Sequence, residues 1–134
     1  MSFALDPRLE ADTLPVADLA LCTVRLMNDC RYPWLVLVPR RAGAVEIHTL
    51  APADRAALLE ETCRAAEALA GIAPGCKINT GALGNIVRQL HVHVLARFEG
   101  DPAWPGPVWG HSPAAAYDRQ AAAERIAQLR RVLR

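Results

Sequence analysis

The chain has 134 residues, of which 52% are hydrophobic, and its 15 basic residues nearly balance 14 acidic ones. This length suits one domain, which at this size buries roughly two thirds of its unfolded surface without disulfides or metal ions. The net charge of +1 argues against a strongly basic nucleic-acid or membrane-surface binder. We therefore expect a globular protein whose partner is neither a nucleic acid nor a membrane.

The hydrophobic pattern predicts two groups of strands, each followed by a helix. In chain order it predicts a short helix after Asp6-Pro7, strands over 21–27 and 34–39, a short edge segment at 46–48, a helix over 52–70, and strands over 76–81 and 89–97. A segment rich in Pro, Gly and Trp follows at 101–110, and a last amphipathic helix is predicted over 114–133. This order favours a single α+β domain over residues 1–134 with an antiparallel sheet.

The start of the chain and its cysteines predict the cellular compartment. Residues 1–6 lack the basic and apolar regions of a secretion signal, and no apolar run reaches the ~18 residues of a membrane span. Because no C-x-x-C spacing is present, we expect buried free thiols at Cys22, Cys30, Cys63 and Cys76. Both observations predict a cytoplasmic protein.

The predicted helix over 52–70 repeats apolar residues at spacings of three and four, which is typical of a helix with one buried face. Its charged residues, Glu61 among them, are expected outside that face. The predicted core stripe consists of Ala56, Leu59, Cys63, Ala66 and Ala70.

Two histidines and a glutamine share one face of the strand predicted over 89–97. Successive strand side chains point to opposite faces, so one face is aliphatic and the other carries Gln89, His91 and His93. Neighbours in this row are ~7 Å apart. A protein seldom packs such a polar row against its core, so this face is the candidate active site.

This strand and the loop before it resemble the signature of the histidine triad (HIT) superfamily of nucleotide hydrolases and transferases. The signature is His-φ-His-φ-His-φ-φ, with φ apolar, after a loop that contains Gly and Gln. Residues 84–95 read Gly-Asn-Ile-Val-Arg-Gln-Leu-His-Val-His-Val-Leu, so Gln89 stands where the family has its first histidine. The resemblance covers about residues 15–98 and includes Asn79 and the long helix. The Trp-Pro-Gly-Pro-Val-Trp segment at 104–109 is similar to a bacterial subgroup labelled HIT-domain or dinucleoside-polyphosphate-hydrolase-like.

The resemblance implies a HIT-like fold, in which the long helix lies on one face of an antiparallel sheet of about five strands and a C-terminal helix follows. It implies a homodimer whose two sheets join edge to edge. It also implies hydrolysis or transfer at the α-phosphate of a purine nucleotide or dinucleotide, through a nucleotidyl-histidine intermediate. The bond broken would be a phosphoanhydride or a phosphoramidate. No cofactor is implied, and a divalent metal ion would arrive only with the substrate.

The resemblance also assigns roles to single residues. His91 is the expected nucleophile, and a neutral imidazole is a good nucleophile near pH 7. It assigns the phosphate contacts to Gln89, His93, Asn85 and Gly84. It assigns the ribose contact to Asn28, with Asp29 beside it, and it places Leu26 in one wall of the nucleobase pocket. Trp104 and Trp109 would pack across a dimer, close the pocket or anchor the core.

Two other functions stay open. Glutamine cannot share a proton as an imidazolium does, so Gln89 makes a nucleotide-binding protein with little turnover a credible alternative. His91 and His93 could instead chelate zinc, although no cysteine or carboxylate at a fitting spacing completes the ligand set. A purely structural domain belongs with this second alternative, and His48 and His111 are expected at the surface.

Overall fold

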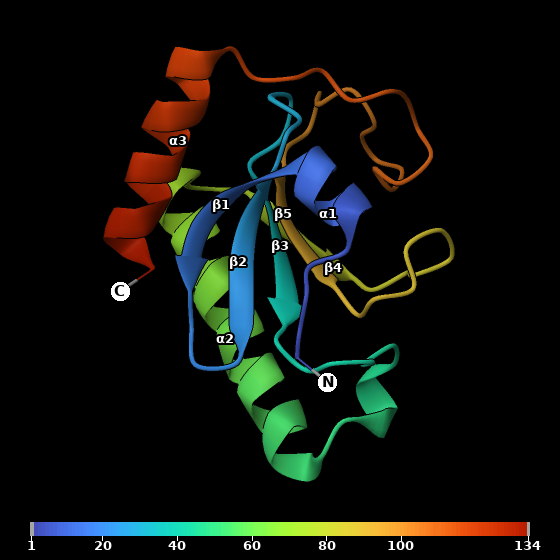
Figure 1. Cartoon of the computed structure of the whole chain (residues 1–134). Helices are drawn as coiled ribbons and strands as arrows, with labels where there is room; N and C mark the ends of the chain where they lie inside the picture. The colour runs from blue at the N-terminus through green and yellow to red at the C-terminus, as the bar shows by residue number, and fades with distance from the viewer. Residues whose placement is uncertain (1, 134) are drawn as a thin grey trace.

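Five antiparallel strands form one sheet in the computed structural model, which describes residues 2–133 (Figure 1). The strands are β1 Thr13–Asp18, β2 Cys22–Met27, β3 Trp34–Pro39, β4 Lys77–Gly81 and β5 Val92–Arg97. Their order in the sheet is β1-β2-β3-β5-β4, so β5 lies inside the sheet and β4 at its edge. The predicted α+β fold with a five-stranded antiparallel sheet is confirmed.

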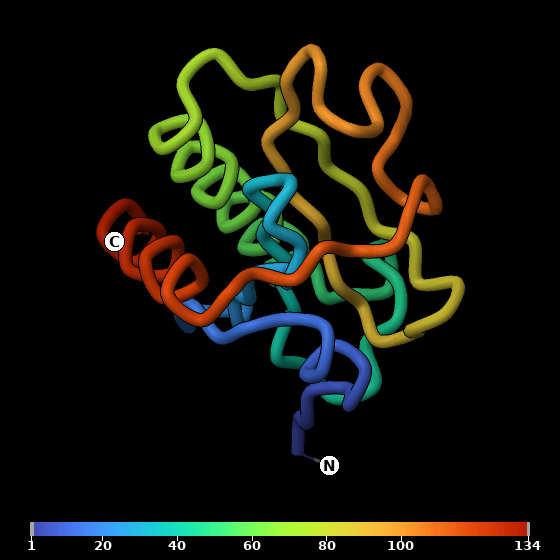
Figure 2. The backbone as a smooth tube through the Cα atoms, turned by 90° about the horizontal axis from the view of Figure 1, so that it is seen from above, coloured from blue at the N-terminus to red at the C-terminus, as the bar shows by residue number. Residues whose placement is uncertain are grey.

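The helices are distributed unequally over the two faces of the sheet. They are α1 Pro7–Asp12, the short 3-10 helix η1 Ile47–Thr49, α2 Pro52–Ile72 and α3 Arg119–Val132. Figure 2 shows α2 and α3 together on one side of the sheet, whereas the loop over 101–112 runs along the other. The long helices thus cover one face and leave the other to α1 and irregular chain.

Alternation along β5 supplies side chains to both faces. Val92 and Val94 join the core beneath α2, as predicted from the aliphatic half of the pattern. Leu95 belongs to a second core on the opposite face, together with Val36 of β3. His93 occupies the same side as Leu95, since the two residues differ by one full strand period.

Several predicted boundaries differ from the structure. No strand was predicted over 13–18, yet β1 forms there and accommodates Pro15 at the sheet edge, beside a register shift between Pro15 and Ala17. The segment at 46–48 belongs to η1 rather than to a strand, β5 begins at Val92, and α3 begins at Arg119.

The predicted core stripe of α2 is wrong except at Ala66, which is half-buried against the core. Leu59 is 64% exposed, whereas Glu61 is only 4% exposed. The Glu61 carboxylate accepts hydrogen bonds from the backbone N–H groups of Leu21 and Cys22, at 2.9 and 2.8 Å. A carboxylate that satisfies two buried donors can face the core, so α2 is rotated relative to the prediction. The buried residues of α2 are Leu58, Glu61, Ala65, Ala68 and Leu69.

A buried ion pair anchors the Pro/Trp segment to the sheet. Arg97, at the end of β5, donates to Asp101 at 2.7 and 3.0 Å and to the Asn79 side chain at 3.0 Å. Trp109 then packs against β4, where a Cβ on Gly81 would lie 2.9 Å from Trp109 Cη2. The segment over 101–110 is therefore held against the edge strand β4, next to β5, which carries His93.

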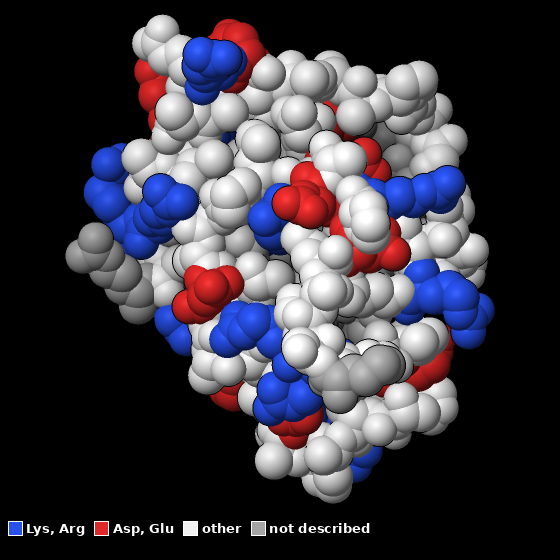
Figure 3. Space-filling model, in the orientation of Figure 1, with Lys and Arg blue, Asp and Glu red and all other residues white. Residues whose placement is uncertain are grey.

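The surface and the cysteines add three observations. Lys and Arg are interspersed with Asp and Glu on the face shown in Figure 3. None of the helices within residues 2–133 is both long and apolar enough to cross a membrane.

All four cysteines are free thiols, but only Cys22 is buried, so the prediction of burial is wrong for Cys30 and Cys63, which are exposed. Burial, and then the Glu61 carboxylate, raise the pKa of the Cys22 thiol.

Candidate active site

A cavity of about 740 Å³ lies on the sheet face opposite α2 and is lined by His91 and His93. Its walls come from α1, from the end of β2 and the following loop, from the loop over 83–87, and from the segment over 108–114. This volume is in the range that holds small-molecule ligands. Four distant parts of the chain thus enclose the predicted catalytic face.

The position of the His91 proton is fixed by a backbone group. His91 Nδ1 lies 2.7 Å from the carbonyl oxygen of Gln89, and the ring is only 7% exposed. A carbonyl oxygen accepts but cannot donate, so Nδ1 carries the proton of the neutral ring. The lone pair is therefore on Nε2.

His93 holds the opposite tautomer. Trp34 Nε1 lies 3.0 Å from His93 Nδ1, and an indole nitrogen can only donate, so Nδ1 of His93 is an acceptor and Nε2 carries the proton. Burial, and then the nearby His91, lower the pKa of His93 to about 4. The two rings meet edge to face with centroids 4.9 Å apart. A nitrogen lone pair on His91 and a neutral N–H donor on His93 thus belong to adjacent rings.

The loop between β4 and β5 places Gly84 and Asn85 at the cavity. Gly84 has φ +74°, a conformation that favours glycine. The exposed Asn85 side chain has no hydrogen-bond partner among the described residues, and neither backbone N–H of this pair is used as a donor within residues 2–133. These groups can donate hydrogen bonds to an anion bound beside His91.

The two residues expected at the ribose differ in placement. Asp29 lines the cavity, while Asn28 does not; Asn28 Oδ1 accepts from the backbone N–H of Tyr117 at 2.9 Å. Arg31 holds Asp29 through Nε and Nη2, both at 2.9 Å. Burial raises the pKa of Asp29, but the hydrogen bonds from Arg31 outweigh it and keep the pKa below its usual value. Asp29 is thus a charged acceptor whose Oδ2 has one protein donor.

Two further expectations do not fit the geometry. Leu26 is fully buried in the core beneath α2, because its strand position points away from the cavity, and Met27 lines the cavity instead. Gln89 lines neither cavity near His91. Its Oε1 accepts from the Asp6 N–H and its Nε2 donates to the Ala4 carbonyl, both at 2.8 Å. The strand starts after Gln89, so the alternation that placed this side chain beside His91 does not apply to it.

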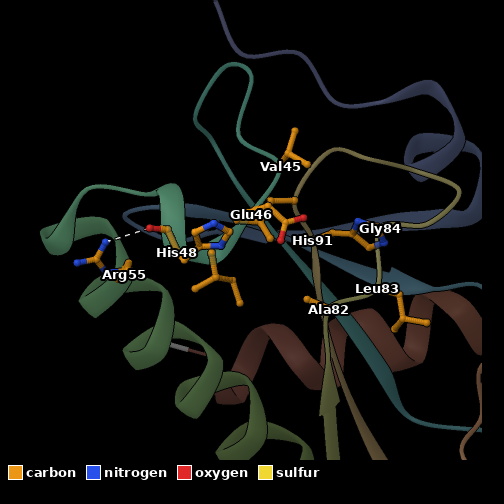
Figure 4. Close-up of a pocket in the computed structure, with 10 residues that line it drawn as sticks. Val45, Glu46, His48, Arg55, Ala82, Leu83, Gly84 and His91 are labelled. Carbon is orange, nitrogen blue, oxygen red and sulfur yellow. Dashed lines mark hydrogen bonds between the residues drawn. The ribbon is translucent and has the colours of Figure 1, made fainter.

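A second, smaller cavity of about 390 Å³ lies on the other side of His91 (Figure 4). His48 and Arg55 line one side of it and Leu83 and Gly84 the other. Arg55 Nη1 donates to the carbonyl of Leu50 at 2.8 Å, which orients the guanidinium. His91, Leu83 and Gly84 line both cavities.

Comparison with known proteins identifies the family. The family profile described as the HIT domain matches residues 8–100, which is more than half of the chain. This chain belongs to the HIT family. Three solved structures are similar over nearly the whole length, and all three are named histidine triad proteins. No curated protein matches the chain.

The three HIT structures agree closely in fold. The protein from Sinorhizobium meliloti is 53% identical, with a TM-score of 0.92, and the match covers 95% of this chain and 94% of that one. The protein from Bradyrhizobium japonicum is 45% identical, with a TM-score of 0.96 and full coverage of both chains. The protein from Marinobacter aquaeolei is 44% identical, with a TM-score of 0.96 and coverage of 99% and 97%. HIT proteins are typically nucleotide-binding hydrolases or transferases, and the HIT-like fold expected for this chain is confirmed.

Sequence reasoning missed two groups at this HIT site, Trp34 and Arg31. Trp34 was assigned only to an apolar strand, yet its N–H fixes the His93 tautomer across 59 residues. Arg31 binds Asp29 and also Ser112 Oγ, at 2.7 Å, and so joins the turn after β2 to the Pro/Trp segment. Trp109, for which closing the pocket was one predicted role, lines the cavity and packs on His93 with ring centroids 5.6 Å apart; it also packs against the second core. Only the Asp29–Arg31 pair had a local signal, since it spans two residues.

Proposed function

We propose that this HIT protein hydrolyses or transfers nucleotides by attack of His91 on an α-phosphate. The observation that carries the proposal is the pair of opposite tautomers: the Gln89 carbonyl leaves His91 Nε2 as a nucleophile, and Trp34 leaves His93 Nε2–H as a donor. The low pKa of His93 keeps it neutral at physiological pH, so its N–H persists there. The substrate is a phosphoanhydride or a phosphoramidate of a nucleotide.

The reaction has two displacements at phosphorus. In the first, the His91 Nε2 lone pair forms a P–N bond while the bond to the leaving group breaks; the leaving group departs with the electron pair and gains a proton from solvent. The positive charge on the His91 ring is shared with the Gln89 carbonyl through Nδ1–H. In the second, water forms a P–O bond, the P–N electron pair returns to Nε2, and the water proton passes to solvent. Another acceptor in place of water makes the reaction a transfer.

The residues around the histidines support this assignment. His93 Nε2–H, the Asn85 amide and the backbone N–H groups at Gly84 and Asn85 bind the non-bridging phosphate oxygens. The larger cavity takes the purine nucleoside, with Asp29 accepting from the ribose and Met27 contacting the base. The smaller cavity gives the leaving group room beside His91.

No cofactor enters this proposal, and any divalent metal comes with the substrate. Zinc chelation by His91 and His93 is disfavoured, since Trp34 occupies the His93 Nδ1 lone pair and Nε2 is then protonated. Within residues 2–133 no group of three or more His, Cys, Asp or Glu side chains has the arrangement of a metal site.

A homodimer joined through β4 is also proposed. Among the described strands β4 pairs only with β5, so its outer backbone groups are open to a second copy. The cytoplasmic location predicted from the sequence remains a prediction.

A nucleotide-binding protein with little turnover is the second candidate. The engagement of Gln89 with residues 4 and 6 favours it, because no proton donor then occupies the first triad position. Turnover of a dinucleoside polyphosphate or an adenosine phosphoramidate separates the two candidates. Thermal stabilisation by nucleotides without turnover favours the second.

The decisive variant of the proposed reaction is His91→Ala. We expect loss of turnover with nucleotide affinity kept within about tenfold, since the change removes the nucleophile and little ground-state contact. His111→Ala is the matched control, because this exposed histidine lines neither cavity. His93→Ala removes one phosphate donor and lowers kcat on the order of 10²-fold. Wild-type turnover in His91→Ala would exclude the mechanism.

A further inference from the structure

Gln89 is bound at both ends, and each end contacts a different part of the site. Its side-chain amide joins residues 4 and 6 of the N-terminal segment, and its main-chain carbonyl accepts from His91 Nδ1. The side-chain contacts span 83 and 85 residues of sequence. No other residue described here links the start of the chain to the expected nucleophile in this way.

The chain at Gln89 has little support from the sheet. β5 begins at Val92, and residues 82–89 belong to no helix or strand. The following N–H, that of Leu90, donates to the Ala44 carbonyl at 2.9 Å. The direction of the Gln89 carbonyl therefore depends on that contact, on the Leu90 side chain buried in the core, and on the two side-chain hydrogen bonds to the N-terminal segment.

We propose that Gln89 is a positioning residue that couples the N-terminal segment to the His91 tautomer, and that this is its function at the first triad position. The amide offers one acceptor to the Asp6 N–H and one donor to the Ala4 carbonyl, so the segment and the carbonyl are held together. The same segment leads into α1, whose Arg8 and Leu9 line the larger cavity. The orientation of His91 thus depends on the Gln89 side chain, whereas α1 keeps its own N-cap at Asp6.

This inference rests on the proposed function for its kinetic consequence, but its structural consequence is independent of turnover. In Gln89→Met, which keeps the length but not the polar atoms, the Nδ1–H tautomer of His91 should give way in part to Nε2–H. Imidazole nitrogen chemical shifts in NMR report this change directly. If the protein turns nucleotides over, kcat should fall by up to about tenfold, the effect of one neutral hydrogen bond, with KM nearly unchanged.

The Asp6 N–H can be removed separately. Asp6 has φ −56°, which proline adopts without strain, so Asp6→Pro deletes this donor while keeping the backbone path. Asp6→Ala is the matched control, because it removes the same side-chain cap from the Arg8 N–H but keeps the donor to Gln89. Arg88→Met controls for a change in the exposed loop.

The expected result is that Gln89→Met and Asp6→Pro each shift the His91 tautomer, that the two controls do not, and that the double variant is no worse than the worse single one. Such non-additivity indicates a shared contact. Unchanged tautomers in both variants would overturn the proposal. The proposal would also be overturned if the effects of Gln89→Met and Asp6→Pro multiplied in the double variant. A rise in nucleotide Kd in Gln89→Met as large as its loss of kcat would overturn it too, because it would place Gln89 at the phosphate. Absence of turnover in the wild type would refute the proposed enzyme and leave the tautomer measurement as the test of the positioning role.

Discussion

Mild acid should destabilise this protein mainly through His93. The native pKa of His93 is about 4, whereas an unfolded histidine titrates near 6.5. As the pH falls below 6.5 the unfolded chain gains a proton that the native site refuses, because the ring is buried and its Nδ1 is already an acceptor for Trp34. Stability is therefore lost as the pH falls from 6.5 towards 4, and not above this window.

The size of the effect follows from the difference between the two pKa values. A shift of 2.5 units corresponds to about 3 kcal/mol in full, and lowering the pH from 7 to 5 should cost about 2 kcal/mol. Asp29 and Asp101 act in another window, since their pKa values are lowered and their stabilisation is lost only as the pH falls below about 4. Between pH 7 and 5 the contribution of His93 is thus separable from theirs.

Urea unfolding followed by tryptophan fluorescence at pH 7 and pH 5 measures this loss. His93→Asn is the informative variant, because its Oδ1 can accept from Trp34 and the side chain does not titrate. We expect the variant to lose about 2 kcal/mol less than the wild type on acidification. His111→Asn, at an exposed histidine, should behave like the wild type. Equal pH dependence in the wild type and His93→Asn would refute the burial argument.

Two further predictions concern the cavity and its metal independence. Gly81→Ala should displace Trp109, because the new Cβ would lie 2.9 Å from the indole, and should therefore weaken nucleotide binding measured by calorimetry. Gly71→Ala is the control: a Cβ at this position has no neighbour within 4 Å, so binding should be unchanged. Nucleotide binding should survive EDTA and gain nothing from added zinc, because the His93 Nδ1 lone pair is occupied; loss on chelation with recovery on zinc addition would favour the metal-binding alternative.

The strand periodicity correctly placed His91 and His93 at one cavity, but it predicted the start of the strand too early. Val92 and Val94 enter the core and His93 borders the cavity, as alternation along β5 requires. His91 also borders the cavity, although it immediately precedes the strand. Gln89 falls outside the strand, so its side chain follows the loop and not the pleat. The contacts that fix the two tautomers were beyond sequence reasoning, because one is a backbone carbonyl and the other comes from β3.

The phase of α2 could not be read from hydrophobicity. Alanine and leucine occupy both candidate stripes, so the pattern has no unique apolar face, and Glu61 made the correct one appear polar. The buried role of this carboxylate depends on two N–H groups about 40 residues away. Periodicity detects side chains that avoid water and gives no weight to a charge whose partners lie on another element.

The buried role of Glu61 leads to a stability prediction. Glu61→Ala leaves the N–H groups of Leu21 and Cys22 buried without acceptors, and each such group costs about 1–3 kcal/mol, so we expect a loss of about 2–6 kcal/mol in the free energy of unfolding. Glu61→Gln keeps one acceptor and should lose less. Glu60→Ala, one position away on the exposed side of α2, should change stability by less than about 0.5 kcal/mol. Urea unfolding at pH 7 compares the three, and equal stability of Glu61→Ala and Glu60→Ala would refute the stabilising role of the two hydrogen bonds to Glu61.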